Sequence, residues 1–353
     1  MDIYLINVII LYIVTTFAKS VEKKQKLLSN ILLIIAILIP TIIAGLRYNV
    51  GTDYFNYIAW FEQYIDNNIY FSSKDLGFVF FIKFIQIFTR NYMWLFMISA
   101  LIINSLVLLF VKKNTKEYNL GYTLFFTLYS YYSSLNITRQ WIAISIFLIA
   151  LNFAFENKKI KSCILILLAS TFHKTALFLL PFAFIPSIKL NKKNITIVFS
   201  IILIILLSFE NVVIKISKYI NLTQYLNYLK NMESSGGGYA YLVFGSLTLA
   251  FMIILKREYK NLNKHNNGHF WMICILVAFA FFGPINFIFD RLTSYFVPIL
   301  YVCIPNLTGL AKNDNQKKFC NFIITVISFI YMIKCLMNNG GQVVPYQTIW
   351  RFL

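Results

Sequence analysis

The sequence predicts an all-α integral membrane protein that crosses the bilayer many times. Hydrophobic residues make up 59% of the 353 residues and charged residues only 13%, whereas an ordinary soluble domain has about 25% charged residues. Aromatic residues reach 18%, which excludes a disordered chain, because such chains are poor in aromatic side chains. The apolar residues form long runs separated by short lysine clusters, a pattern typical of membrane helices and their loops. We therefore expect a single transmembrane domain over residues 1–353.

Most apolar runs are long enough to be expected as spanning helices, since a helix needs about 20 mainly apolar residues to cross the hydrocarbon core. The first run has no basic segment before it, so it is interpreted as a span and not as a cleaved signal peptide. Two further apolar stretches fit a straight span less well: 76–89 is short, and 163–187 carries His173 near its middle. The expected spans are 2–18, 27–46, 92–111, 120–137, 141–156, 194–210, 239–255, 269–288, 291–311 and 319–337.

The charge is lopsided, with 32 Lys and Arg against 13 Asp and Glu and a net charge of +19. Because the lysines cluster between apolar runs, this excess favours the positive-inside pattern of a membrane protein over nucleic-acid binding. If every basic loop faces the cytoplasm, stretch 163–187 must enter and return as a re-entrant or broken helix pair. Two loops on the same side of the membrane must be separated by an even number of crossings. This requirement predicts about 10–12 transmembrane helices in all, with outer-face segments at 47–75 and 211–238. The basic loops are 19–26, 112–116, 158–161, 189–193, 256–264 and 312–318.

Three arginines stand at predicted outer ends of apolar runs, each inside a polar cluster: Arg47, Arg139 and Arg291. One arginine at such a place is often explained by snorkelling to the membrane interface. Three on the same face favour a binding role, because a guanidinium makes planar, bidentate contacts with phosphate, whereas an ammonium acts as a point charge. The sequence therefore predicts a diphosphate site formed by these arginines, with Gln140 and Tyr295 from the same clusters.

Three side chains are candidates for proton transfer. His173 is the only histidine in an apolar setting, and ionisable groups at membrane depth are costly and usually functional; the alternative is a hydrogen-bonded structural histidine. Asp53 and Asp290 belong to the arginine clusters, where each either neutralises its neighbouring arginine or acts as a base. His173, Asp53 and Asp290 are the predicted catalytic residues.

The sequence lacks the motifs of several common chemistries. It contains no GxxxxGK[ST], HExxH or GxSxG string, which are the signatures of nucleotide-binding loops, zinc proteases and serine hydrolases. The five cysteines lie in or beside apolar runs without a CxxC pair, so neither a disulfide framework nor a metal site is predicted. We expect no metal and no cofactor.

Five strings, in order along the chain, resemble the EpsG family of Wzy-like polymerases of bacterial surface polysaccharides: RYNVGTDYFNY, NITRQWIAISIFLIAL, AxxFHKTALFLLP, DRLTSYF and VVPYQ. The resemblance implies a GT-C-like membrane glycosyltransferase in the bacterial inner membrane, with its active site facing the periplasm or exterior. It further implies that a growing glycan leaves one polyprenyl diphosphate and joins a sugar of a second lipid-linked oligosaccharide, without metal or nucleotide. Regulators of chain length are the expected protein partners.

Three other functions stay open from the residues alone. A flippase for lipid-linked sugars would also need cationic groups in an apolar bundle, although such carriers usually show internal repeats and none is evident here. A membrane O-acyltransferase could use His173 as its base. A ligase that moves finished glycan to a lipid acceptor would share the donor of a polymerase and differ only in the acceptor.

Overall fold

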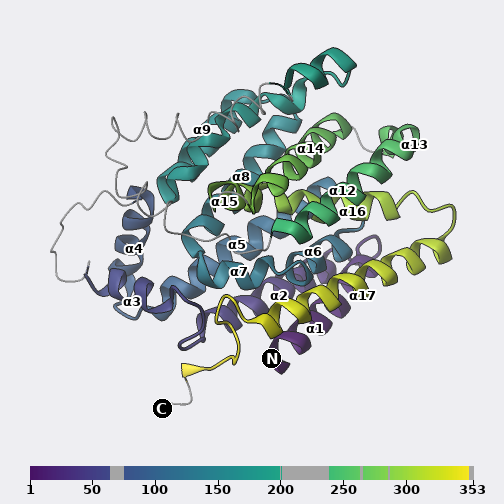
Figure 1. Ribbon diagram of the computed structural model, residues 1–353. Helices are drawn as coiled ribbons and strands as arrows, with labels where there is room; N and C mark the ends of the chain where they lie inside the picture. Colours follow the sequence, from purple (N-terminus) through teal and green to yellow (C-terminus); the bar gives the residue numbers. More distant parts are fainter. Residues whose placement is uncertain (64–74, 199, 201–237, 263–264, 285–286, 350–353) are drawn as a thin grey trace.

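The computed structural model describes residues 1–63, 75–198, 200, 238–262, 265–284 and 287–349. The regular elements within these residues are helices (Figure 1). The one β-type pairing among them is an isolated antiparallel bridge between Arg47 and Thr348. The predicted all-α class is therefore confirmed.

Five of the described helices are long and apolar enough to cross a membrane: α1 Asp2–Val21, α2 Lys26–Gly45, α5 Met93–Asn114, α8 Thr138–Phe155 and α17 Asp314–Asn338. Residues 192–198 are also helical. The shorter named helical elements are α3 Tyr54–Gln63, α4 Leu76–Phe88, α6 Tyr118–Thr127, α7 Ser130–Asn136, α9 Lys159–Phe172, η1 Lys174–Ala183, η2 Ile185–Ser187, α12 Gly238–Ile254, α13 Lys256–Leu262, α14 Asn266–Phe282, α15 Phe287–Phe296, η3 Val297–Ile299 and α16 Leu300–Thr308.

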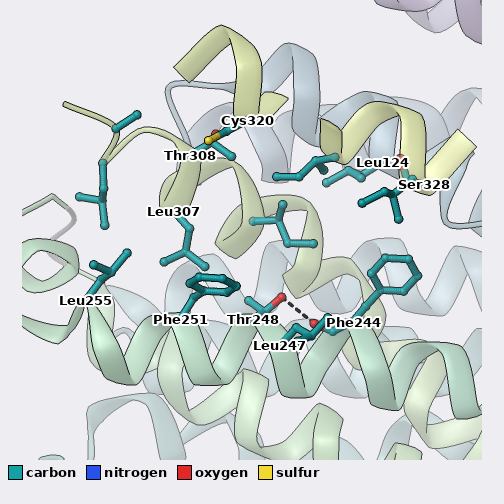
Figure 2. Close-up of a pocket in the computed structure, with 15 residues that line it drawn as sticks. Leu124, Phe244, Leu247, Thr248, Phe251, Leu255, Leu307, Thr308, Cys320 and Ser328 are labelled. Carbon is teal, nitrogen blue, oxygen red and sulfur yellow. Dashed lines mark hydrogen bonds between the residues drawn. The ribbon is translucent and has the colours of Figure 1, made fainter. Parts of the chain in front are cut away.

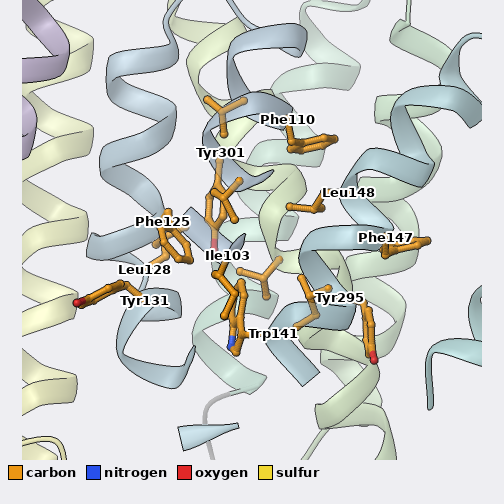
Figure 3. Packing of buried hydrophobic residues seen from close by; sticks show 14 of the residues in the cluster. Ile103, Phe110, Phe125, Leu128, Tyr131, Trp141, Phe147, Leu148, Tyr295 and Tyr301 are labelled. Carbon is orange, nitrogen blue, oxygen red and sulfur yellow. The ribbon is translucent and has the colours of Figure 1, made fainter. Parts of the chain in front are cut away.

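Helix α8 lies at the centre of the bundle and packs against α5, α9, η1 and α15. Its Trp141 is 2% exposed, and the ring of Phe125 in α6 lies 5.6 Å from that of Trp141 and 6.1 Å from that of Tyr301 in α16 (Figure 3). In lipid, helices associate mainly through close packing and interhelical hydrogen bonds. This interlocked aromatic layer is therefore what holds the central helices in register.

The outward faces of the peripheral helices are apolar, the reverse of a soluble protein. On α1, Ile6, Ile9 and Ile13 are 55%, 52% and 60% exposed, while the polar side chains of Asn7 and Thr15 are buried. Exposing branched aliphatic side chains on this scale is favourable only against hydrocarbon, where they lose no solvation energy. The surface therefore confirms the membrane class that the composition predicts.

Two expected spans are interrupted. The run 120–137 is divided into α6 and α7 at Tyr129, whose φ is +66°, and the run 291–311 is divided by η3, which contains Pro298. A proline lacks the amide hydrogen that an α-helix needs. At the first break, the Leu128 carbonyl accepts a hydrogen bond from the Tyr241 hydroxyl at 3.1 Å. This tertiary hydrogen bond satisfies a carbonyl at the first break. Each of the two expected spans is therefore made of shorter helical segments and not of one continuous helix.

The stretch 163–187 forms the broken pair that the charge parity predicts. Helix α9 ends at Phe172, His173 is extended with φ −153°, and the 3-10 segment η1 follows and packs back on α9. The other irregular stretch is α4, a helix of 13 residues that is too short for a full crossing. Most of the expected span 194–210, and of the outer segment 211–238, lies outside the described residues.

The described helices have two chemically different ends. Helix α8 has 18 residues, about 27 Å at about 1.5 Å per residue; Arg139 lies at its start, and Glu156, which pairs with Lys113 and Lys158, follows its last residue. We call these the arginine end and the lysine end. Helices α3 and α4 belong to the arginine end and lie at the left of Figure 1, whereas α13 belongs to the lysine end and lies at the right. The bundle therefore separates the two ends.

Candidate functional site

At the arginine end, Arg139 forms an ion pair with Asp75. Arg139 Nη1 lies 2.8 Å from Asp75 Oδ2; the first residue stands at the start of α8 and the second directly before α4. The guanidinium also stacks on Trp60 of α3, with its carbon 4.4 Å from the ring centroid. Arg139 Nε is buried and has no hydrogen-bond partner among the described residues. The guanidinium is therefore fixed in place with a donor still to be satisfied.

His173 lies beside the same carboxylate. Its Nδ1 is 3.9 Å from Asp75 Oδ2, and Asp75 Oδ1 accepts a hydrogen bond from the backbone amide of Lys174 at 3.2 Å. Both ring nitrogens of His173 are buried and form no hydrogen bond within the described chain. Burial lowers the pKa of His173, the nearby Asp75 opposes this, and the charges of Arg291 and Arg139 add to the lowering. The lowered pKa favours the neutral imidazole, and neither ring nitrogen is hydrogen-bonded within the described chain.

A second arginine is held by a reciprocal pair of hydrogen bonds. Arg291 Nη1 donates to Gln140 Oε1 at 2.9 Å, and Gln140 Nε2 donates to the Arg291 carbonyl at 2.9 Å. One turn further along α15, the Tyr295 hydroxyl is 3.2 Å from Thr175 Oγ1 of η1. Gln140 and Tyr295, at 1% and 0% exposure, therefore join α15 to α8 and to η1.

Asp53 completes the cluster. It stands just before α3 and is half-buried. Burial raises its pKa, while the positive charges of Arg291 and Arg139 oppose the rise. Because both arginines act on Asp53 and on His173, these charged groups share one electrostatic environment. We define the polar cluster as Asp53, Asp75, Arg139, Gln140, His173, Arg291 and Tyr295.

Two sequence-predicted residues have different surroundings. Arg47 is 2% exposed, and its Nη1 and Nη2 donate to the carbonyls of Ala44 and Leu135 at 2.9 and 3.1 Å. It also lies 4.1 Å from the centroid of the Phe96 ring, so its geometry is that of a clamp between helix ends. Asp290 is half-buried in α15 and acts electrostatically on Tyr241 of α12. Arg47 Nε, like Arg139 Nε, is buried without a hydrogen-bond partner among the described residues. The roles of Arg47 as a diphosphate ligand and of Asp290 as a base stay predictions.

Residues 339–349 form a strap that is bonded to the loop preceding Asp53 of the polar cluster. The strap runs along the loop after α2, where Gly51 adopts φ +101° and a Cβ atom would lie 2.6 Å from Asn136 Oδ1. Asn136 Oδ1 in turn accepts the Thr52 amide at 2.6 Å, which ties the loop to the residues preceding α8. Only glycine tolerates both the conformation and the contact. The strap bonds, at 2.8–3.1 Å, are Gly51 N to Gln342 O, Tyr48 N to Gln347 O, Ile349 N to Leu46 O, Tyr4 Oη to Val343 O and Tyr346 Oη to Ile43 O.

Sequence reasoning missed Asp75 and Trp60 as parts of the site. Asp75 is remote in sequence from any arginine. Aspartates were chosen as candidate catalytic residues only where they belonged to an arginine cluster. One signal was present: Asp75 is the last polar residue before a short apolar stretch that cannot span, so it had to lie near the outer ends. Within the described residues, no group of three or more His, Cys, Asp or Glu side chains is placed to hold a metal ion.

An apolar groove of about 460 Å³ runs between α12, α16 and α17. Figure 2 shows Phe244, Leu247 and Phe251 of α12 on one side of it and Leu307 and Cys320 on the other. Tyr241, which lies within the electrostatic reach of Asp290, stands one turn before Phe244 on α12. The groove follows α12 from Phe244 as far as Leu255, the residue after this helix, and Lys256, the first residue of α13, comes next, so the groove extends towards the lysine end.

Comparison with known proteins gives one match. The model of the EpsG family matches residues 30–348, nearly the whole chain, and so covers every residue of the polar cluster. This match supports a polysaccharide polymerase of the Wzy-like kind in general. No curated protein and no solved structure matches the chain, so the GT-C-like architecture stays a prediction.

Proposed function

We propose that this chain, which belongs to the EpsG family, joins lipid-linked oligosaccharide repeat units at the outer face of the bacterial inner membrane. The observation that carries the proposal is the set of unsatisfied buried groups at Arg139 Nε and at both ring nitrogens of His173. Buried polar groups in proteins nearly always have partners. A guanidinium nitrogen and an imidazole that form no hydrogen bond in the described chain, in two residues that both lie beside Asp75, are suited to a substrate that brings both a phosphate and a hydroxyl group.

In this proposal, Arg139 and Arg291 hold the diphosphate of the donor lipid. Each guanidinium is already oriented, one by Asp75 and Trp60 and the other by Gln140, so little reorganisation is needed when the phosphate binds. Fixed donors aimed at the leaving diphosphate stabilise the negative charge that develops as its bond to the sugar breaks.

The reaction then needs one proton transfer. A hydroxyl oxygen of the acceptor sugar attacks the anomeric carbon of the donor, the bond from that carbon to the diphosphate oxygen breaks, and the diphosphate leaves with the electron pair. His173 accepts the hydroxyl proton, because burial keeps the imidazole neutral and so able to accept it. Such a base contributes typically about 10²–10⁴-fold. Asp53, whose pKa burial raises, is the second candidate base, and Asp290 remains an untested third.

The apolar groove fits the hydrocarbon chain of the carrier lipid. Its lining extends along α12 from Phe244 to Leu255, the residue that follows this helix, about 16 Å at about 1.5 Å per residue. It is lined almost entirely by apolar side chains, which is the surface an isoprenoid chain would contact. A lipid lying in this groove would have its head group towards the arginine end.

The test of the polymerase activity is deletion of the gene followed by gel analysis of the surface glycan. We expect the ladder of chain lengths to collapse to a single repeat unit and to return on complementation with the wild-type gene. Complete loss of surface glycan would instead indicate a flippase or a ligase and would overturn the proposal.

The orientation in the membrane is tested separately by single-cysteine labelling in a cysteine-free variant. Cysteines placed beside Arg139 and His173 should react with a membrane-impermeant reagent from outside, and cysteines beside Lys113 only after the membrane is opened. Labelling of the Arg139 site only from the cytoplasm would show that the orientation is the reverse of the one proposed.

A further inference from the structure

The lysine end contains a large cavity of its own. Its volume is about 850 Å³, and it lies where the ends of α1, α5, α16 and α17 meet the segment before α6. Six lysines and two glutamates line it: Lys19, Lys23, Lys112, Lys113, Lys116, Lys317, Glu22 and Glu117. The cavity is therefore strongly positive, and the length of α8 separates it from the polar cluster.

Four of the six lysines are positioned by carboxylates. Glu117 is 5% exposed and forms ion pairs with both Lys19 and Lys317, which joins α1 to α17. Burial by itself would raise the pKa of Glu117, but the hydrogen bonds from the two lysines outweigh it, so the pKa lies below its ordinary value. The remaining pairs are Lys112 with Glu22 at 3.1 Å and Lys113 with Glu156 at 2.7 Å.

Two lysines of the cavity have no such partner. Lys23 and Lys116 are exposed and form no ion pair with any described residue. They lie on different segments, one after α1 and the other between α5 and α6, and both contribute to the cavity wall. Positive charge at this place is thus left without a counter-charge from the described protein.

The cavity has a rigid polar floor. Asn114 and Asn306 are 2% and 3% exposed, and Asn306 Nδ2 donates to the Asn114 carbonyl at 3.1 Å. Asn114 Nδ2 donates to Asn152 Oδ1 at 2.6 Å, which fixes the floor to α8. The lysines of this cavity therefore surround a concave site whose floor is buried and hydrogen-bonded. Lysines that only define topology need no such floor.

We propose that the lysine cavity binds a phosphate-bearing anion, either the headgroup of an anionic lipid or a soluble diphosphate. The excess of lysines supplies the charge, because the positive-inside rule accounts for lysines in loops but not for their convergence on one cavity. Basic pockets between transmembrane helices on the cytoplasmic side are known to hold phosphate headgroups. The cavity shares no residue with the polar cluster, so this proposal can be tested independently of the polymerase activity.

The test uses the purified full-length protein and two probes. Inorganic pyrophosphate is titrated in detergent by calorimetry, and cardiolipin retention in mixed nanodiscs is counted by native mass spectrometry. We expect saturable binding of at least one probe, weakened about tenfold or more in Lys23→Gln/Lys116→Gln. The matched control is Lys192→Gln/Lys193→Gln, which removes two exposed lysines outside the cavity and should bind as the wild type does.

The outcomes separate the sources and the alternatives. Retention of cardiolipin without pyrophosphate binding identifies a lipid headgroup, and the reverse identifies a soluble anion. Absence of saturable binding of both probes would overturn the proposal, as would equal weakening in the control pair, since that result would show an effect of overall charge. The substituted side chains are exposed, and size-exclusion chromatography confirms that each variant is folded before it is tested.

Discussion

The ion pair of Arg139 with Asp75 and the ion pairs of Glu156 with two lysines hold their charges in opposite ways. The Asp75 side chain is 8% exposed where it pairs with Arg139, and both residues contact further elements. The side chains of Lys113 and Lys158, which pair with Glu156, are 43% and 52% exposed. Charges that are solvated can be replaced at little cost, whereas charges held in a fixed geometry cannot. The comparison predicts that replacing a member of the Arg139 pair costs more than replacing a member of the Glu156 pair. Glu117, which pairs with Lys19 and Lys317, is buried like Asp75 although it lies at the lysine end.

The largest effect is expected for His173→Gln. Glutamine keeps hydrogen-bonding capacity but cannot carry the proton, so polymer formation per folded molecule should fall by about 10²–10⁴-fold. The wild-type rate should decline as pH falls through the lowered pKa of His173, because protonation removes the base, and the variant should lack that decline. The measurement is the rate in vitro from pH 5 to 8.

The matched control is His265→Gln at the lysine end. His265 Nδ1 lies 3.1 Å from the Phe155 carbonyl, far along α8 from the polar cluster, so its replacement should leave the rate and its pH dependence unchanged. A His173→Gln variant with the wild-type rate and pH profile would remove His173 from the mechanism and leave Asp53 as the principal base.

Next in size is Arg139→Lys, or equally Arg291→Lys. Each keeps the charge and loses the planar fork, so we expect the rate to fall by about 10²–10³-fold, the cost of removing one donor to a developing anion. The control is Arg257→Lys, an exposed arginine of α13. Full activity in both site variants would contradict direct recognition of the diphosphate by guanidinium groups.

A smaller effect is expected for Asn136→Ala, which tests how the arginine end is held in place. The change removes the acceptor that lies 2.6 Å from the Thr52 amide. Because Thr52 is exposed, we expect a loss of about 0.5–1.5 kcal/mol, the net contribution of a typical hydrogen bond. Unfolding by denaturant in mixed micelles measures the loss. Asn194→Ala, at an exposed site, is the control, and an equal effect in both variants would argue against a bracing role for the loop.

The smallest effect is expected for Glu156→Gln at the lysine end. Hydrogen bonds from Lys113 and Lys158 lower the pKa of Glu156 to about 2. The stabilisation is therefore present above the ordinary carboxyl pKa and is lost as pH falls through the folded value. Because the pair is solvated, we expect less than about 1 kcal/mol, an unchanged polymer rate and a difference that shrinks in salt. A large fall in polymer rate would show that the two ends are not functionally separate.

The sequence by itself determined the class of the protein, the division of its charges and the break at His173. These features depend on residues that are close in the sequence. The length of an apolar run does not depend on what packs against it, and basic loops on both sides of stretch 163–187 require that stretch to turn back. The same reasoning located Arg139, Arg291 and His173 at a common end. Hydropathy and charge are properties of a segment and can be read without knowing its neighbours.

The tertiary structure alone decided which of those residues meet. Asp75 joins Arg139 and His173 although 64 residues separate it from the arginine, and Arg47, similar to Arg139 by sequence, is bonded to two backbone carbonyls. The break at Tyr129 depends in the same way on a hydroxyl from α12. A hydrogen bond requires two groups within about 3 Å and an ion pair within about 4 Å, and that proximity is set by which helix ends pack together. No local pattern in the chain contains that information.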